Sequence, residues 1–296
     1  MQLLDGKKIL NEIKAELAAE VEGLVKTNQR RPHLAAILVG NDGASQTYVA
    51  SKEKNCRDIG FNSTVFRLDE SVSEIELLEL IQNININPEI DGLIVQLPLP
   101  SNIQPQKVID AISPEKDIDG FNTLSTGKLT KGQDTFLPAT PFGIVQLLQR
   151  YHIDVQGKHC VIIGRSDIVG RPLSILLSQN SKYANATVTL CHSRTPDIGV
   201  FAKQADILVA ALGKPEFITA DMVKMGAIVI DVGITRIEDS SRKSGYRLAG
   251  DVKFDEVAPK CSYITPVPGG VGLMTIASLL MNTMKAYKLN SKQAQN

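Results

Sequence analysis

Ser45, Tyr48 and Lys52 are three polar residues that could do chemistry, and they share the segment SQTYVASKEK over 45–54. Tyr48 and Lys52 are four residues apart, so on a helix over 44–59 they share a face with Ser45, while Lys54 points elsewhere. A lysine that points into a cleft could act as an acid or a base if burial lowered its pKa. A lysine on a helix is more often solvated, so this segment alone leaves both interpretations open.

Two further polar residues could join this lysine. Gln96 interrupts the apolar run 92–97, which is typical of a strand buried in a parallel sheet. Ligands of open parallel sheets gather at the carboxyl ends of the strands, where Gln96 lies, and a lysine ammonium could be the partner that its amide needs. Asp119 stands in the segment 117–120 (DIDG), where it could equally be a turn former before the glycine.

A glycine-rich turn follows the apolar strand predicted over 159–163. It reads GRSDIVGRP from Gly164 and leads into a helix, so its backbone N–H groups could hold a phosphate. It departs from the usual G-x-G-x-x-G fingerprint, because Ser166 replaces the second glycine and the third is displaced to Gly170. The turn alone therefore fits a structural role as well as a dinucleotide site.

The next predicted strand, over 187–191, bears on the choice of cofactor. In NAD enzymes an acidic residue at the end of this strand takes the ribose 2′-hydroxyl. Here the strand ends in His192-Ser193-Arg194-Thr195 without an acid. Serine and arginine can bond a 2′-phosphate that a carboxylate would repel, so Arg165 and Arg194 are candidate phosphate partners and NADP is favoured over NAD. The alternative is that both arginines are solvated surface charges.

A third segment, TPVPGGVG over 265–272, is rich in proline and glycine. Its glycines at positions 269, 270 and 272 allow close approach of the backbone to a flat ligand or a cofactor. The alternative is a helix entry with unusual turns.

The elements that must position these residues alternate between helix and strand, which predicts an α/β fold. A helix after Asp5, a strand over 33–39, a helix over 44–59, a strand over 63–68 and a helix over 72–84 opened by Ser73 precede the strand 92–97. The loop-rich stretch 113–141 is the best domain boundary. Beyond it we expect a compact nucleotide-binding sheet with strands over 159–163, 187–191, 206–210 and 227–231, helices over 169–179 and near 197–203, and a last helix over 274–287. We therefore predict two domains, 1–139 and 140–272, with the segment 273–296 packing back on the first, and we find no internal repeat.

Composition excludes several classes of protein. The 296 residues carry 32 basic and 32 acidic side chains, and 43% are hydrophobic, as in an ordinary globular protein. The absence of a basic surplus argues against nucleic-acid binding, and no apolar run approaches a membrane span. The four cysteines form no C-x-x-C pair and the four histidines show no metal-ligand spacing. With no secretory signal visible, we expect a cytoplasmic protein without a metal.

Five segments in order, YVASKEK, VQLPLP, PEKDIDGF, GRSDIVGRP and TPVPGGVG, closely resemble those of the bifunctional methylenetetrahydrofolate dehydrogenase/methenyltetrahydrofolate cyclohydrolase family. The resemblance covers about residues 5–288. It implies a catalytic domain and a Rossmann-like NADP-binding domain separated by a cleft. It also implies two reactions: oxidation of 5,10-methylenetetrahydrofolate with NADP to the 5,10-methenyl form, and hydrolysis of that product to 10-formyltetrahydrofolate.

The resemblance further implies roles for individual residues. Lys52 matches the catalytic lysine, Tyr48 stacks on the folate, Gln96 tunes the lysine and Asp119 binds the pterin ring. The implied substrate site also includes Val95, Leu97, Pro268, Gly269, Gly270 and Gly272, and the implied cofactor site includes Gly164, Arg165, Ser166, Ser193, Ile234 and Thr275. The family is usually a homodimer joined through its Rossmann domains. One departure is Leu273, where many members have proline.

Two other functions stay open from the sequence. One is a member of the family that retains only one of the two activities. The other is a catalytically silent nucleotide-binding or scaffolding protein, which would have no chemical need for Tyr48, Lys52, Gln96 and Asp119 together.

Overall fold

A computed structural model describes residues 1–241 and 245–293 and divides the chain into two compact units. Residues 11–139 and the chain from 276 onward form one unit, called here the three-stranded unit. Residues 1–10 and 140–275 form the other, called the six-stranded unit. The described helices include none that is long and apolar enough to cross a membrane.

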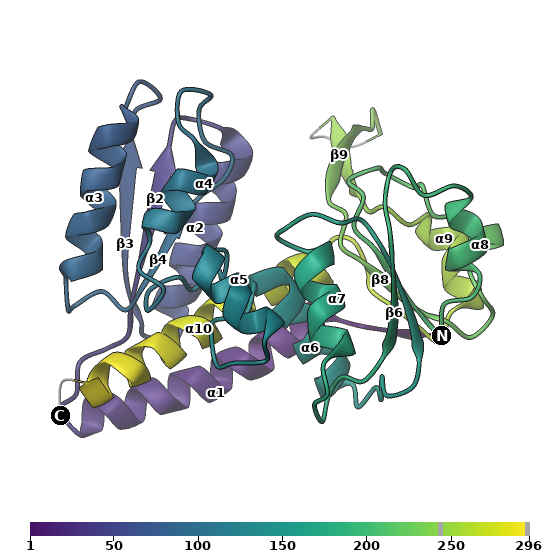
Figure 1. Ribbon diagram of the computed structural model, residues 1–296, viewed down its shortest axis with the longest axis horizontal. Coiled ribbons are helices and arrows are strands. Elements are labelled where there is room, and N and C mark those ends of the chain that lie inside the picture. Colours follow the sequence, from purple (N-terminus) through teal and green to yellow (C-terminus); the bar gives the residue numbers. More distant parts are fainter. Residues whose placement is uncertain (242–244, 294–296) are drawn as a thin grey trace. The chain divides into compact units, whose positions relative to one another are not determined.

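The three-stranded unit is built on a parallel sheet in the order β3-β2-β4, with β2 over His33–Val39, β3 over Asn62–Leu68 and β4 over Gly92–Val95. Four shorter helices belong to it: α2 (Gly43–Asp58), α3 (Glu74–Ile86), α4 (Pro105–Ala111) and α5 (Thr123–Thr130). Apolar side chains of α3 and α4 pack on one face of the sheet, and α2 packs against β2 and β3. Figure 1 shows α1 (Gly6–Lys26) and α10 (Val271–Gln293) side by side, and an ion pair joins Glu20 to Lys288.

Local signals account for the starts of two helices, α3 and α1. The Ser73 hydroxyl accepts the N–H of Glu76, whose carboxylate accepts the N–H of Ser73, so the predicted start of α3 is confirmed as a capping box. Asp5 likewise accepts the N–H groups of Lys7 and Lys8 at the start of α1.

One expectation about local structure in this unit was wrong. The strand predicted over 92–97 ends at Val95, so Gln96 lies just beyond it. The Gln96 N–H still donates to Ile37 O at 2.9 Å, but the proline that follows Leu97 has no N–H with which to continue the ladder. The loop-rich stretch 113–141 also contains α5, whose start the Asn122 side chain caps by accepting the N–H of Leu124.

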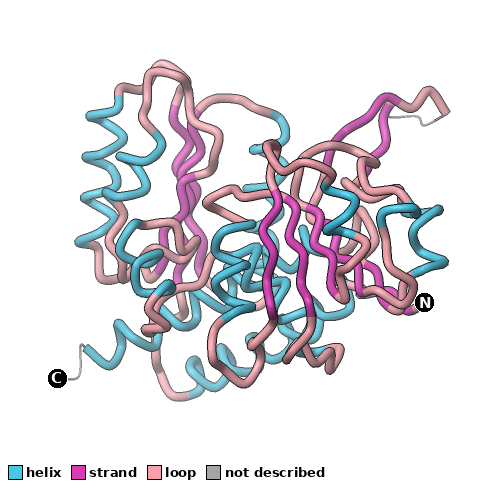
Figure 2. Tube along the Cα trace, turned by 45° about the vertical axis from the view of Figure 1, so that its right-hand side comes forward, coloured by secondary structure: helices cyan, strands magenta, loops and turns pink. Residues whose placement is uncertain are grey.

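The six-stranded unit has a parallel sheet in the order β1-β11-β8-β7-β5-β6. Its strands are β1 (Gln2–Leu3), β5 (His159–Ile163), β6 (Thr187–Cys191), β7 (Ile207–Ala210), β8 (Ile228–Asp231) and β11 (Tyr263–Ile264). Its helices are α6 (Ala139–Arg150), α7 (Gly170–Ser178), α8 (Ile198–Ala202) and α9 (Phe254–Val257), with short 3-10 turns at Ala220–Met222 and Ala258–Lys260. The antiparallel hairpin of β9 (Thr235–Glu238) and β10 (Tyr246–Ala249) forms a separate ribbon (Figure 2).

The placement of the first ten residues differs from the predicted domain 1–139. Gln2 and Leu3 pair in parallel with Tyr263 and Ile264 at the edge of the six-stranded sheet. This pairing joins residues far apart in the sequence, so no local pattern in the first ten residues could indicate it.

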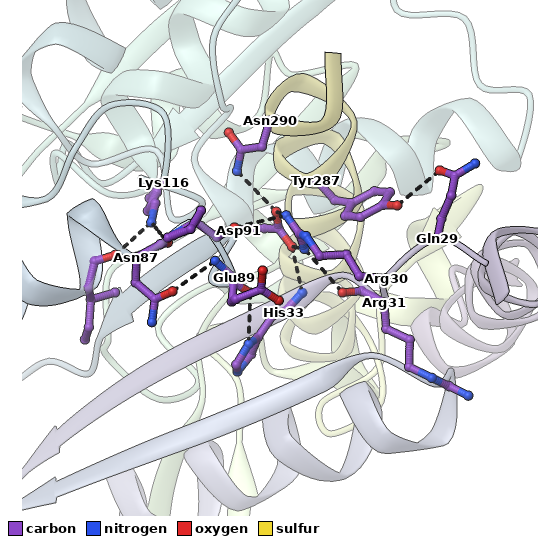
Figure 3. Close-up of polar contacts among 12 residues, drawn as sticks. Gln29, Arg30, Arg31, His33, Asn87, Glu89, Asp91, Lys116, Tyr287 and Asn290 are labelled. Atoms are coloured by element: carbon purple, nitrogen blue, oxygen red, sulfur yellow. Dashed lines mark hydrogen bonds and ion pairs between the residues drawn. The ribbon is translucent and has the colours of Figure 1, made fainter. Parts of the chain in front are cut away.

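Both sheets repeat one hydrogen-bonded arrangement, although the sequence shows no repeat. In the three-stranded unit the backbone N–H of His33 donates to Asp91, and one ring nitrogen contacts Glu89 O (Figure 3). The other ring nitrogen of His33 contacts the Thr64 hydroxyl. In the six-stranded unit His159 makes the corresponding contacts with Asp206, Gln204 O and Thr189. Each histidine thus joins the amino ends of three neighbouring strands, which gives both histidines a structural role.

Candidate active site

Lys52 is a buried ammonium on α2. It is 5% exposed, its Nζ lies 4.5 Å from the centroid of the Tyr48 ring, and it donates to Gln96 Oε1 at 3.2 Å. The lysine and the tyrosine share a helix face, as their spacing predicts, whereas Lys54 is exposed and pairs with Asp58. The aromatic face and the amide oxygen hold the ammonium away from bulk water.

The amide of Gln96 is oriented by a second hydrogen bond. Its Nε2 donates to Leu97 O at 2.7 Å, so its Oε1 is the atom that faces Lys52. Gln96 follows β4, next to the position where the strand order β3-β2-β4 reverses direction. Ligands of open α/β sheets bind at the carboxyl ends of strands at such a point.

Asp119 is the acidic partner of this lysine. It lies in the turn 117–120, and its charge raises the pKa of Lys52, although burial has the larger effect and lowers that pKa overall. Burial raises the pKa of Asp119, and the Lys52 charge opposes this shift. The structure therefore brings Tyr48, Lys52, Gln96 and Asp119 together, with Val95 and Leu97 on either side of Gln96. A lysine whose pKa is lowered gives up its proton more readily than an exposed lysine, as a proton-transfer group must.

A neighbour of Lys52 that sequence reasoning missed is Cys56, one helical turn further along α2. Burial raises the pKa of its thiol to about 12, so Cys56 stays neutral and forms part of the wall behind the lysine. The i, i+4 spacing from Lys52 could have indicated this contact.

The glycine-rich turn after β5 is closely packed. A Cβ at Gly164, whose φ is +124°, would lie 2.1 Å from Ala211 O, and a Cβ at Gly170 would lie 1.8 Å from Gly164 O. Only glycine fits either position, so the turn folds tightly onto the start of α7. Arg165 and Ser166 stay exposed on it, at the reversal of strand order between β5 and β7.

The tip of β6 keeps its polar side chains available. His192 Nδ1 accepts the N–H of Arg194, and the Thr195 hydroxyl accepts the N–H of His192, so the tip is a compact turn. Ser193 and Arg194 are both exposed there. A tight glycine turn, a helix N-terminus and an uncharged or basic strand tip together fit a dinucleotide with a 2′-phosphate.

The proline- and glycine-rich segment 265–272, whose last two residues open α10, belongs to the six-stranded unit. A Cβ at Gly272 would lie 2.8 Å from Ile234 Cδ1, so the structure brings these two predicted site residues together. Thr275, in the first turns of α10, shares a hydrogen bond of 3.0 Å with the Thr140 hydroxyl. Leu273 donates its N–H to Gly270 O at 3.3 Å, a bond that proline at this position could not make.

Two buried carboxylates support this edge of the sheet and were not predicted. Asp231 ends β8 and accepts the N–H groups of Gly233, Asp251 and Val252, while burial raises its pKa to about 6. Asp251 accepts the N–H groups of Leu212 and Gly213 after β7. The sequence could have indicated Asp231, because it is an acidic residue at the end of the apolar run 228–231.

Comparisons with known proteins agree with this geometry. Residues 4–119 match the family model described as tetrahydrofolate dehydrogenase/cyclohydrolase, catalytic domain, and residues 138–291 match its NAD(P)-binding domain. A protein of Porphyromonas gingivalis named Bifunctional protein FolD is 58% identical over 97% of this chain and 97% of its own length.

Solved structures give the same result. The bifunctional methylenetetrahydrofolate dehydrogenase/cyclohydrolase of Campylobacter jejuni is 46% identical, with a TM-score of 0.92 over 98% of this chain and 99% of that one. The Trypanosoma brucei enzyme, solved with NADP cofactor and an inhibitor, is 38% identical, with a TM-score of 0.91 over 96% of each chain. The chain belongs to the tetrahydrofolate dehydrogenase/cyclohydrolase family.

Proposed function

We propose that this chain catalyses two successive reactions of one-carbon folates. It oxidises 5,10-methylenetetrahydrofolate to 5,10-methenyltetrahydrofolate with NADP, and it hydrolyses the methenyl form to 10-formyltetrahydrofolate. The observation that carries the proposal is the buried Lys52 ammonium, held by Gln96 and Tyr48 and balanced by Asp119, in a chain of this family. A silent relative would gain nothing from burying a charge in this way.

Each residue of the three-stranded unit has a role in this proposal. Tyr48 offers an aromatic face to the folate ring, and Asp119 accepts hydrogen bonds from the N–H groups of the pterin. In the hydrolysis, water adds to the methenyl carbon, one C–N bond breaks and one proton is released. Lys52 moves a proton between the water-derived oxygen and the leaving nitrogen, and Gln96 keeps its Nζ in place. Val95 and Leu97 line the substrate next to Gln96.

The six-stranded unit holds the cofactor in this proposal. NADP, when bound, accepts the hydride that leaves the methylene carbon. Gly164, Arg165 and Ser166 receive its phosphates at the start of α7, Ser193 contacts the 2′-phosphate, and Ile234 and Thr275 contact the remainder.

The proposed function is tested by two separate assays on the purified chain. With methylenetetrahydrofolate, NADP should be reduced, and with methenyltetrahydrofolate alone, the methenyl absorbance should fall faster than in buffer. Loss of only the second activity would mean a monofunctional member, and loss of both would overturn the proposal.

The remaining proposals concern assembly and location. We place the enzyme in the cytoplasm as a homodimer joined through its six-stranded units. The four cysteines are free and buried, as suits a reducing compartment, and β6 lies at an edge of its sheet, where a second copy could pair. Light scattering on the purified protein should give twice the chain mass.

Replacing Ser193 with aspartate should reverse the preference for NADP. The new carboxylate would face the 2′-phosphate. Two like charges about 4 Å apart repel each other by ~1 kcal/mol in bulk water and by ~4 kcal/mol near a protein surface. We expect kcat/KM with NADP to fall by about 10- to 100-fold, while kcat/KM with NAD stays the same or rises. Ser193→Asn, which adds similar bulk without charge, is the control. Equal losses with the two cofactors would remove Ser193 from the 2′-phosphate site.

A further inference from the structure

Asp119 sits at the third position of the four-residue turn 117–120. The N–H of Gly120 donates to Asp117 O at 3.0 Å and closes the turn. Gly120 has a φ of +71°, and a Cβ there would lie 2.6 Å from the backbone nitrogen of Pro138. Residues 137 and 138 therefore confine the turn at Gly120. The position of the turn also depends on the groups that bind the backbone N–H groups of residues 121 and 122.

The side chain of Asp117 binds both of these N–H groups. Its Oδ1 accepts the N–H of Phe121 at 3.1 Å and its Oδ2 accepts the N–H of Asn122 at 2.9 Å. With the Gly120 bond to its carbonyl, three consecutive N–H groups converge on this one residue. The carboxylate is buried, and Asp117 as a whole is 1% exposed. Burial raises its pKa to about 7, which the backbone donors and the Ser125 hydroxyl oppose.

The start of the turn is anchored to the strand that leads to Gln96. The N–H of Leu93, in β4, donates to Lys116 O at 2.9 Å, and Leu93 and Asp117 form an isolated parallel bridge. Lys116 Nζ donates to Ile84 O at 2.7 Å and to Asn87 O at 2.6 Å, at the end of α3. Asp117 therefore stands between a fixed strand and the turn that carries Asp119.

We propose that Asp117 is a positioning residue that sets where the Asp119 carboxylate meets the folate, an inference that rests on the proposed function. Asp117 itself is buried and its two oxygens are each engaged by a backbone N–H, so it acts through the turn and not on the substrate. Asparagine at this position keeps one acceptor and turns an NH₂ group toward a backbone N–H. The turn must then shift, and Asp119 moves with it.

A double-mutant cycle tests this inference with Asp117→Asn, Asp119→Asn and the two together. Asp117→Asn should raise the KM for methylenetetrahydrofolate by about 10-fold, with little change in the KM for NADP. In the Asp119→Asn background the same change should raise that KM by less than about twofold, because the residue through which Asp117 acts is already altered. Equal factors in the two backgrounds would show a role independent of Asp119 and overturn the inference.

Two further variants keep the test decisive. Asp110→Asn is the matched control, because Asp110 accepts the N–H and hydroxyl of Thr123 at the next turn of the chain and should leave both KM values unchanged. If Asp117→Asn does not fold, Ser125→Ala removes only the hydroxyl beside the carboxylate. It should raise the folate KM by about two- to threefold, again only when Asp119 is present, and no rise would count against the inference. An inactive wild-type chain would instead reject the proposed function.

Discussion

Replacement of Lys52 by methionine is expected to lower the hydrolysis of methenyltetrahydrofolate by at least about 100-fold, the contribution of one positioned proton-transfer group. Methionine keeps the apolar stem that packs beside Tyr48 but carries no proton. The Kd for NADP should change by less than about twofold, because the neighbours of Lys52 all belong to the three-stranded unit. The melting temperature should fall, because Gln96 Oε1 loses its donor and the buried Asp119 loses its counter-charge. Steady-state hydrolysis, NADP titration and thermal unfolding measure the three quantities.

Lys54→Met is the matched control for this variant. Lys54 lies on the same helix, its side chain is 69% exposed, and it pairs with Asp58 at the surface. Both activities should survive its loss. If Lys52→Met hydrolysed the methenyl substrate at the wild-type rate, the proton-transfer role of Lys52 would be rejected, however well the family resemblance holds.

The shared face of Tyr48 and Lys52 could be predicted because it depends only on helix geometry. Any helix over these residues places positions 48 and 52 on one side, and the Ser73 capping box is equally local. The strands that carry the glycine turn were predictable for a similar reason, since buried parallel strands are short and continuously apolar. For these residues, the spacing along the chain is enough to predict which side chains share a face or a strand.

Other parts of the site depend on contacts between distant segments. The orientation of the Gln96 amide follows from its bond to Leu97 O and from the end of β4 two residues before Leu97, and the expectation of a longer strand missed both. The same holds for Asp231, whose three N–H donors come from two loops. Asp117 was recognised only as part of a turn motif, because its burial depends on β4 and α5 packing around it. Burial of polar groups is a tertiary property, so sequence can suggest the residue but not its partners.

The buried Asp91 shows how strongly such distant contacts stabilise the fold. The carboxylate of this residue, which is fully buried, accepts two hydrogen bonds of 2.7 Å from the Arg30 guanidinium, one from the N–H of His33 and one from Asn290 Nδ2 (Figure 3). Arg30 in turn lies over the ring of Tyr287. Through these contacts Asp91 joins the entry to β2, the entry to β4 and the end of α10.

Replacing Asp91 with alanine is therefore expected to lower the free energy of unfolding by about 3–5 kcal/mol, because a partly buried guanidinium and a buried N–H lose their acceptor at once. Urea unfolding followed by circular dichroism measures the change. Glu22→Ala is the control, since it breaks only the exposed pair of Glu22 and Lys26 and should leave the unfolding midpoint unchanged.

Below the unfolding transition Asp91→Ala should keep both activities, because Asp91 precedes β4 whereas Gln96 follows it. A loss of stability under about 1 kcal/mol would mean that water replaces the carboxylate at little cost, and that the packing of Tyr287 and the apolar faces, not this ion pair, holds the end of α10 to the sheet.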